Sequence, residues 1–283
     1  MENTNAAIRT DLALETAAKG ARISEERLCG LRISRLTGEA GEKYVTLHCP
    51  PMRCLEGDVS DAIADAVAYL LREFCRELTG REVDGETRVL VAGLGNRFIT
   101  SDALGPRTAD KVAVTGHMMG NGGLLSALGC SSISAVRPGV MGQTGIEAAA
   151  VIKGAAEHIR PHVIIAVDAL AARGVNRLAA TVQISDSGIR PGSGIGNCRG
   201  AVNRETMGFP VIALGVPTIV DSATLVLDAL EAAGMVSPPK ELWRVISDGS
   251  FFVSLKDCDI VTDEISSLLA DGINRAFNAE GLR

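Results

Sequence analysis

The chain has 283 residues, of which 46% are hydrophobic, but it contains only one Trp, two Tyr and six Phe. Its formal net charge is -6, and no run of Lys and Arg exceeds two residues, which argues against a protein that binds nucleic acid directly. No segment approaches the ~20 apolar residues that span a bilayer, so we expect no contact with membranes.

Residues 1–5 are polar and lack the apolar stretch of a signal peptide. The seven cysteines are scattered and odd in number, which favours reduced thiols in the cytoplasm. Cys49 and Cys54 lie close together, but no second Cys or His pair follows at the spacing of a zinc site. We therefore expect a cytoplasmic protein without a structural metal.

The first third of the chain combines strands with one long helix. Residues 1–30 are polar and Ala-rich, and we expect them to be mobile or removable. Two strand-like stretches follow at residues 31–34 and 44–48. A helix is predicted over residues 58–78, because apolar residues recur there at spacings of three and four, and Gly80 can end it.

From residue 88 onwards, strands and helices alternate. The pattern predicts strands at 88–92, 132–136, 163–167, 181–184, 211–214 and 251–254, with the fourth at an edge of the sheet. It predicts helices at 103–114, 144–159, 222–233 and 263–277. Alternation of this kind is typical of an α/β protein with a mainly parallel sheet and helices on both faces. We expect one such domain, preceded by an N-terminal α+β extension.

Two aspartates stand at equivalent places in this pattern. Asp102 and Asp168 each follow a segment that reads as a buried strand, and sites form in the crevice outside the carboxyl ends of parallel strands. Two carboxylates that meet there can divide acid and base roles, because like charges held close raise one pKa. Each also has a purely structural interpretation: Asp102 as a helix N-cap and Asp168 as a partner of loop amides.

Two glycine-rich loops accompany the aspartates. Gly93-Leu94-Gly95-Asn96 does not complete a dinucleotide-binding motif, because Phe98 stands where the third glycine is required. We expect no cofactor. Gly93, Gly95 and Asn96 are predicted instead to give the backbone freedom near a substrate.

The second glycine-rich loop, residues 188–197, includes Gly192 and Gly194. It either cradles a phosphate with its amides or covers a cleft, and we predict that these two glycines contact the substrate. The triplet Asp186-Ser187-Gly188 resembles that of pepsin-like proteases, which need two copies on an all-β frame; here an Asx turn after a strand is favoured. No G-x-S-x-G motif is present for a serine nucleophile.

Taken together, six ordered motifs resemble the germination protease family. They are residues 9–15, 93–106, 138–147, 168–173, 183–194 and 213–221. The resemblance implies an atypical aspartic endopeptidase of the forespore and spore core that degrades small acid-soluble spore proteins, with Asp102 and Asp168 as catalytic residues, no metal and a fold like that of phosphorylases and hydrogenase-maturation proteases. It further implies a homotetramer.

The same resemblance implies a self-processing zymogen. Residues 1–11 would be the pro-segment, cut near Asp11 and Leu12, and residues 12–283 a single protease domain with a core at about 85–235. Residues 237–254 form a shorter stretch than the family leads us to expect. Three alternatives stay open: a metal-dependent endopeptidase of the hydrogenase-maturation type that uses the same acids, a nucleotide-dependent oxidoreductase, and an assembly protein without catalysis.

Overall fold

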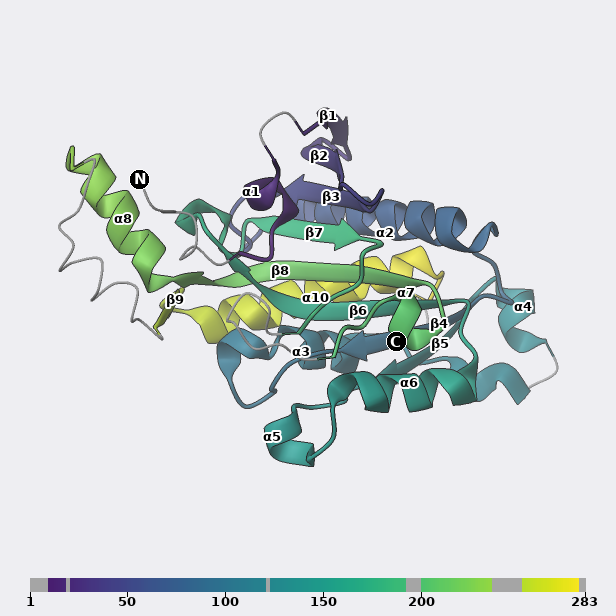
Figure 1. Cartoon of the computed structure of the whole chain (residues 1–283). Helices are drawn as coiled ribbons and strands as arrows, with labels where there is room; N and C mark the ends of the chain where they lie inside the picture. The colour runs from purple at the N-terminus through teal and green to yellow at the C-terminus, as the bar shows by residue number, and fades with distance from the viewer. Residues whose placement is uncertain (1–9, 19–20, 121–122, 192–199, 236–250, 280–283) are drawn as a thin grey trace.

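We describe a computed structural model of the chain, covering residues 10–18, 21–120, 123–191, 200–235 and 251–279. The nine strands of these residues form one sheet, in the order β1-β2-β3-β7-β8-β6-β4-β5, with β9 (Phe252–Ser254) paired to β8. The chain is therefore an α/β protein, as the alternating pattern predicts (Figure 1).

Four strands form the parallel half of the sheet. They are β4 (Arg88–Gly93), β5 (Ser132–Val136), β6 (Val163–Ala172) and β8 (Val211–Asp221), and the pairs β4–β5, β4–β6 and β6–β8 are all parallel. Successive side chains of a strand point to opposite faces. Ile164 and Ile165 are both fully buried in this way, one in each of two separate hydrophobic clusters.

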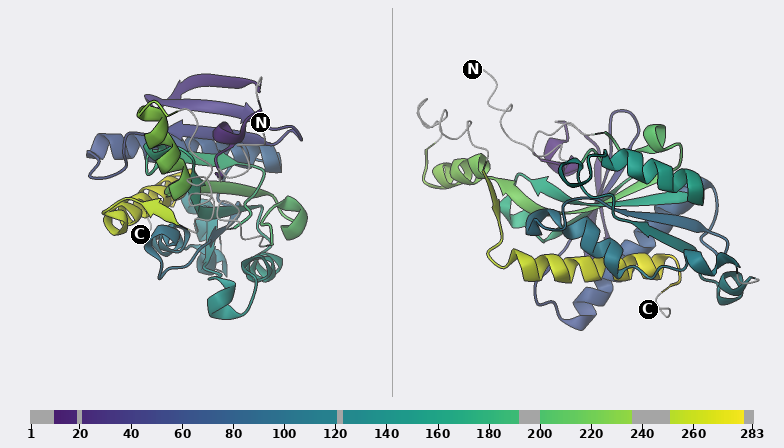
Figure 2. Two further views of the ribbon diagram at one scale, coloured as in Figure 1. Left: turned by 60° about the vertical axis from the view of Figure 1, so that its left-hand side comes forward. Right: turned by 90° about the horizontal axis from the view of Figure 1, so that it is seen from below.

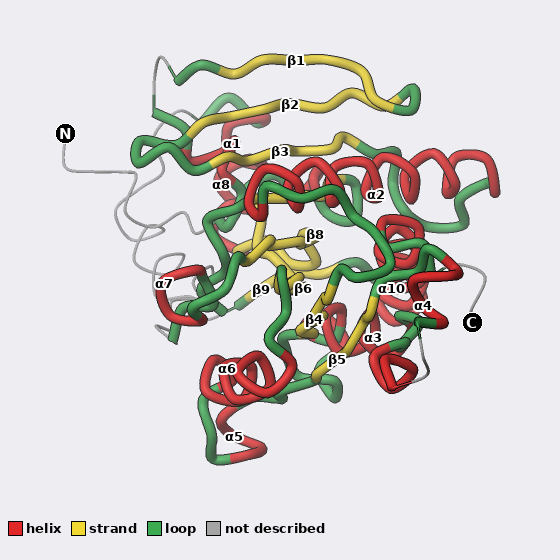
Figure 3. Tube along the Cα trace, turned by 90° about the vertical axis from the view of Figure 1, so that its right-hand side faces the viewer, coloured by secondary structure: helices red, strands yellow, loops and turns green. Residues whose placement is uncertain are grey.

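Helices cover both faces, as Figure 3 shows. On one face lie α2 (Gly57–Thr79), α3 (Leu104–Lys111) and α10 (Cys258–Ala276), which pack against each other and the sheet. On the other face lie α6 (Ala148–Ile159) and the short α7 (Arg204–Met207). The predicted long helix is confirmed almost to the residue, and Gly80 ends it in a left-handed conformation.

The other four strands form the antiparallel half: β1 (Ile23–Leu28), β2 (Leu31–Thr37), β3 (Lys43–His48) and β7 (Thr181–Ser185). The prediction of a mainly parallel sheet is wrong, because antiparallel pairings outnumber parallel ones. The prediction of β7 as an edge strand is also wrong, since it lies between β3 and β8. The stretch from Ala172 to Thr181 is too short for the crossover that a parallel strand needs.

The remaining elements are short or peripheral. They are α1 (Ala13–Thr16), η2 (Thr100–Asp102), η3 (Gly116–Gly120), α4 (Leu124–Leu128), α5 (Met141–Thr144), η4 (Val175–Arg177) and α8 (Ser222–Ala232), which projects beyond the end of β8 (Figure 2). Within the described part of the chain, no helix combines the length and the apolar character that crossing a bilayer requires.

Candidate active site

The site lies where β4 leaves β6. The last residues paired in these two strands are Gly93 and Val167, after which the Leu94 amide still donates to the Val167 carbonyl at 2.8 Å. The chain of β4 then turns away, while β6 continues beside β8 as far as Ala172. The predicted strand 163–167 is thus too short, and Asp168 lies within β6, at the first position beyond the pairing with β4.

Asp168 is held by its own strand. The residue is only 5% exposed, and its Oδ1 accepts a hydrogen bond from the Ala169 amide at 2.9 Å. On the other side of β6, Asp168 is paired with Gly215 of β8. A buried carboxylate fixed by a backbone amide is well oriented for proton transfer.

Asp102 is held by a loop rather than by a strand. It ends η2, and its Oδ2 accepts a hydrogen bond from the Asn96 amide at 2.7 Å. The N-cap of α3 is Ala103 and makes no side-chain capping bond, so the structure does not use Asp102 as the cap. Thr218 of β8 fixes the η2 turn, because its hydroxyl donates to the Ser101 carbonyl at 2.7 Å.

Both aspartates line one cavity of about 200 Å³. The side chains and backbone around it come from the loop after β4, from the segment before α5 and from the far ends of β6 and β8. They include Gly95, Ile99, Gly139, Val140, Ala169, Thr218 and Phe252. Two residues 66 positions apart in sequence therefore face the same small space.

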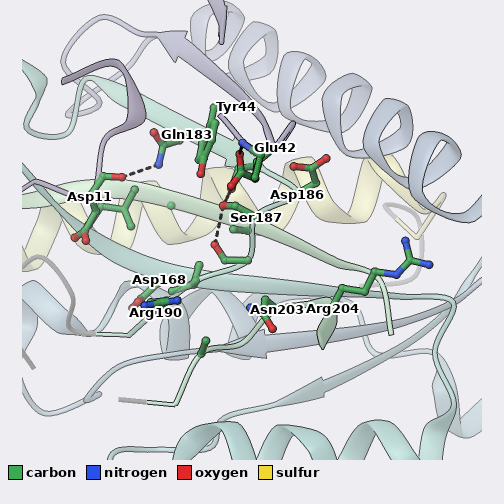
Figure 4. Close-up of a pocket in the computed structure, with 18 of the residues that line it drawn as sticks. Asp11, Glu42, Tyr44, Asp168, Gln183, Asp186, Ser187, Arg190, Asn203 and Arg204 are labelled. Carbon is green, nitrogen blue, oxygen red and sulfur yellow. Dashed lines mark hydrogen bonds between the residues drawn. The ribbon is translucent and has the colours of Figure 1, made fainter. Parts of the chain in front are cut away.

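A second, larger cavity of about 620 Å³ adjoins Asp168 from the side of the antiparallel half. Its lining is strongly polar and carries both signs of charge, as Figure 4 shows. The labelled residues are Asp11, Glu42, Tyr44, Asp168, Gln183, Asp186, Ser187, Arg190, Asn203 and Arg204. A large polar cavity beside a small one with two carboxylates provides room for a polar chain as substrate.

The N-terminal segment that we expected to be mobile or removable is docked from Thr10 onwards. The Asp11 amide donates to the Ala171 carbonyl at 2.9 Å, and the Ala171 amide donates to Asp11 Oδ2 at 2.9 Å. Leu12 is 1% exposed and packs with Leu170 and Ala172. Asp11 therefore lines both cavities together with Asp168.

Two further side chains fix this segment. Glu15 accepts hydrogen bonds from the amides of Arg173 at 2.7 Å and of Gly174 at 3.0 Å. The Gln183 side chain accepts from the Ala13 amide and donates to the Asp11 carbonyl, at 2.8 and 3.0 Å. Carboxylates and amides of the segment thus take the place that a neighbouring strand would occupy along β6.

The predicted substrate-binding glycines have different positions. Gly95 lines the small cavity with a φ of 112°, and a Cβ there would overlap the Asp102 carbonyl, so the position requires glycine. Asn96 supports Asp102 through its amide. Gly93 lies under α3, where a Cβ would overlap the Gly105 carbonyl. Gly192 and Gly194 lie outside the described residues.

The described residues also bear on metal binding and on cysteine reactivity. Among the described residues, no group of three His, Cys, Asp or Glu side chains is placed to hold a metal ion. Burial raises the pKa of the Cys49 thiol to about 12 and that of Cys75 to about 11. Both thiols therefore stay protonated at neutral pH, and neither offers the thiolate that a cysteine nucleophile needs.

Sequence reasoning missed several residues of the site. Thr218 and Gln183 lie on β8 and β7, inside the motifs 213–221 and 183–194, but their local patterns do not distinguish them from other strand residues. The signal for Asp11 was present in part, because residues 9–15 form one of the six motifs, but a motif does not say where its backbone docks.

Comparison with known proteins adds an independent finding. A family model described as germination protease matches residues 2–233. A germination protease of Caldanaerobacter subterraneus subsp. tengcongensis is 39% identical over 95% of this chain and 94% of its own length. Germination proteases of Oceanobacillus iheyensis and Clostridium perfringens strain SM101 are 38% and 35% identical, over 79% and 83% of this chain and 67% and 78% of their own lengths.

Proposed function

Because this chain belongs to the germination protease family and is therefore a peptidase, a hydrolase, we propose that it is an endopeptidase that degrades small acid-soluble spore proteins in the spore core during germination. The observation that carries the proposal is that Asp102 and Asp168 line one cavity. The larger cavity next to it supports an extended peptide as the substrate.

The proposed mechanism uses the two aspartates as a pair. One carboxylate takes a proton from water, whose oxygen adds to the peptide carbonyl carbon. The other, protonated, hydrogen-bonds the carbonyl oxygen and then gives its proton to the leaving nitrogen as the C–N bond breaks. Since the two groups share one proton, they titrate as a pair, and the acid and base roles belong to the pair.

The test replaces each aspartate by asparagine, which removes the negative charge and keeps the hydrogen bond from the backbone amide. Asp102→Asn and Asp168→Asn each keep an oxygen that accepts from the Asn96 or the Ala169 amide. We expect cleavage of a small acid-soluble spore protein to fall by at least about 10²–10⁴-fold, with an unchanged melting temperature.

Asp221→Asn is the matched control for these two variants. Asp221 is also buried and accepts from a backbone amide, that of Ala223 at 2.8 Å, but it lines neither cavity. This variant should keep most of the activity. Wild-type turnover by Asp102→Asn or Asp168→Asn would refute the mechanism, and activity that chelators abolish would favour the metal-dependent endopeptidase instead.

We also propose that the chain is a self-processing zymogen, with residues 1–11 as its pro-segment and a cut near Asp11 and Leu12. Protonation of one acid of a close pair gives a physical reason for an acid trigger. Because Leu12 is buried and Asp11 is bonded twice to Ala171, cleavage at this bond requires the segment to leave its place on β6.

Mass spectrometry after mild acidification measures the processing directly. We expect the loss of about ten N-terminal residues from the wild-type chain and none from Asp168→Asn. An unchanged wild-type mass at every pH at which the fold survives would contradict self-processing. The resemblance to hydrogenase-maturation endopeptidases and the homotetramer remain parts of the same proposal, and light scattering measures the assembly.

A further inference from the structure

The two cavities beside β6 have two lining residues in common. Of all the described residues around them, only Asp11 and Asp168 belong to both the 200 Å³ and the 620 Å³ cavity. Asp168 comes from the middle of the sheet, whereas Asp11 comes from the N-terminal segment docked across it (Figure 4). The point where the cavities meet is therefore bordered by two carboxyl groups from distant parts of the chain.

The backbone of β6 fixes the spacing of these two groups. The Asp168 side chain accepts from the Ala169 amide, and the Asp11 side chain accepts from the Ala171 amide. Both amides point away from β8, on the side of β6 that β4 has left. Amides two residues apart on one strand are separated by roughly 6.6 Å, because each residue rises by about 3.3 Å. The two carboxyl groups therefore lie about that far apart along the strand.

We propose that in the chain before processing, which still carries Asp11, this residue is a third carboxylate of the site, whose charge extends to higher pH the range over which Asp168 keeps its proton. Asp11 is not assigned a bond to the substrate; it acts through Asp168. The inference rests on the proposed function, in which Asp168 is one of the two acids that work on the peptide.

Other titratable and charged groups line the two cavities together with Asp168. Asp102 lines the small cavity. Around the large cavity stand the side chains of Glu42, Tyr44, Asp186, Arg190, Arg204 and Glu205. The two arginines oppose the effect of Asp11 and the carboxylates add to it. These groups do not change when Asp11 alone is altered, so a substitution at Asp11 isolates its share.

Coulomb's law sets the size of the expected effect. Two unit charges roughly 6.6 Å apart interact strongly enough to move a pKa by about half a unit in water and by about two units at the effective dielectric constant near a protein surface. Removal of the negative charge of Asp11 should therefore lower the pH at which Asp168 loses its proton. The difference should shrink as salt is added.

The experiment titrates Asp168 in a full-length chain that cannot cleave itself. In an Asp102→Asn background, the carboxyl carbon of ¹³C-labelled aspartate is followed by NMR against pH, with Asp168 assigned by substitution. Asp11→Asn is compared with the parent, because Asn keeps an oxygen that accepts from the Ala171 amide. We expect the midpoint of Asp168 to fall by about half a unit to two units in Asp11→Asn.

Glu15→Gln is the matched control. It also removes one negative charge from the docked segment, but its carboxylate accepts from the Arg173 amide, four residues beyond the Ala169 amide that holds Asp168. It is thus roughly 13 Å away, about twice as far as Asp11. The midpoint of Asp168 should therefore shift much less in Glu15→Gln than in Asp11→Asn. Glu15→Gln also weakens the attachment of the N-terminal segment to β6. The difference between the Asp168 midpoints of the two variants therefore measures the effect of the Asp11 charge alone.

The outcomes separate this inference from the proposed function. Equal midpoints in Asp11→Asn and the parent, or equal shifts in Asp11→Asn and Glu15→Gln, would overturn the third carboxylate and leave the protease mechanism intact. Full cleavage by Asp102→Asn would overturn the mechanism, whatever the midpoints. The proposed cut removes residues 1–11, so Asp11 acts on Asp168 only in the chain before processing.

Discussion

The two halves of the sheet differ in how they are buried. Strands of the parallel half are covered on both faces, so that Ile164 and Ile165 are each fully buried. Strand β1 of the antiparallel half is exposed along nearly all its length, with Ile23 46% exposed. The two halves therefore contribute differently to the site. The parallel half holds Asp102 and Asp168, whereas the antiparallel half supplies one wall of the large cavity through residues such as Tyr44.

The largest difference between the two halves is expected when one isoleucine side chain in each half is truncated to alanine. Ile165→Ala leaves a hole in a core that packs on α2, α3 and α10, and should cost about 2–5 kcal/mol of unfolding free energy. Ile23→Ala removes the same atoms from an exposed strand and should cost less than about 0.5 kcal/mol. Urea unfolding of both variants measures the difference, and equal losses would show that the two halves are not distinct in stability.

Two glycines give a smaller contrast. A Cβ on Gly105 of α3 would overlap the carbonyl oxygens of Leu94 and Val167, at the place where β4 leaves β6. Gly105→Ala should therefore push α3 from the sheet, cost about 1–3 kcal/mol and lower cleavage, because the loop that carries Asp102 leads into this helix. Gly57 of α2 has open space around its Cβ position.

Gly57→Ala is therefore the control on the helix that covers the antiparallel half. It should leave cleavage unchanged and alter stability by less than about 1 kcal/mol. Thermal unfolding and a cleavage assay on both variants test the pair. If Gly105→Ala has wild-type activity, the contact between α3 and the two strands is not needed to hold the site.

The smallest expected effect concerns two histidines. Burial first, and then Arg88 and Arg81, lower the pKa of His162, whose Nδ1 accepts from the Arg88 amide at 3.0 Å in the parallel half. Burial first, and then Arg32, lower the pKa of His48, which is bonded to the Ser34 hydroxyl at 2.8 Å in the antiparallel half. For both, the folded protein binds protons less readily than the unfolded chain, so stability is lost as pH falls below about 6.5 and through the lowered pKa of each ring.

The two bonds respond differently to that protonation. A charged His162 ring cannot accept from the Arg88 amide, whereas the Ser34 hydroxyl can reverse its role and accept from a charged His48. Between pH 7.5 and 5.5, His162→Gln should therefore remove more of the fall in melting temperature than His48→Gln, by about 1–3 °C. A larger effect of His48→Gln would invalidate the comparison.

The sequence predicts the parallel half well because its periodicities are strong. Strand β5 has its predicted bounds, and β4 is one residue longer than predicted. The helix predicted over residues 263–277 corresponds to α10, in which Ile265, Leu268, Leu269 and Ile273 are buried. By contrast, β1 reads as a polar segment, Ile-Ser-Glu-Glu-Arg-Leu, and becomes a strand only because β2 pairs with it. Tertiary pairing of that kind leaves no local pattern to detect.

The site is predictable in part for a similar reason. Asp102 and Asp168 could be singled out because each follows an apolar run, and the structure brings them to one cavity. Strand β6 extends beyond Asp168 through Ala169-Leu170-Ala171-Ala172, which has a low preference for strands and was not predicted. The docking of Asp11 depends on the amides of this extension, so it could not be foreseen without the longer strand.

The charges along β1 limit how copies of this chain can meet. Glu25 pairs with Arg32, and Glu26 with Arg35, both on the neighbouring β2, at 3.2 and 2.5 Å. If two molecules joined their β1 strands about a twofold axis near these glutamates, carboxylates of one copy would stand opposite those of the other. Pairing of two β1 edge strands into one longer sheet is therefore disfavoured, and we expect a symmetric assembly to use other surfaces.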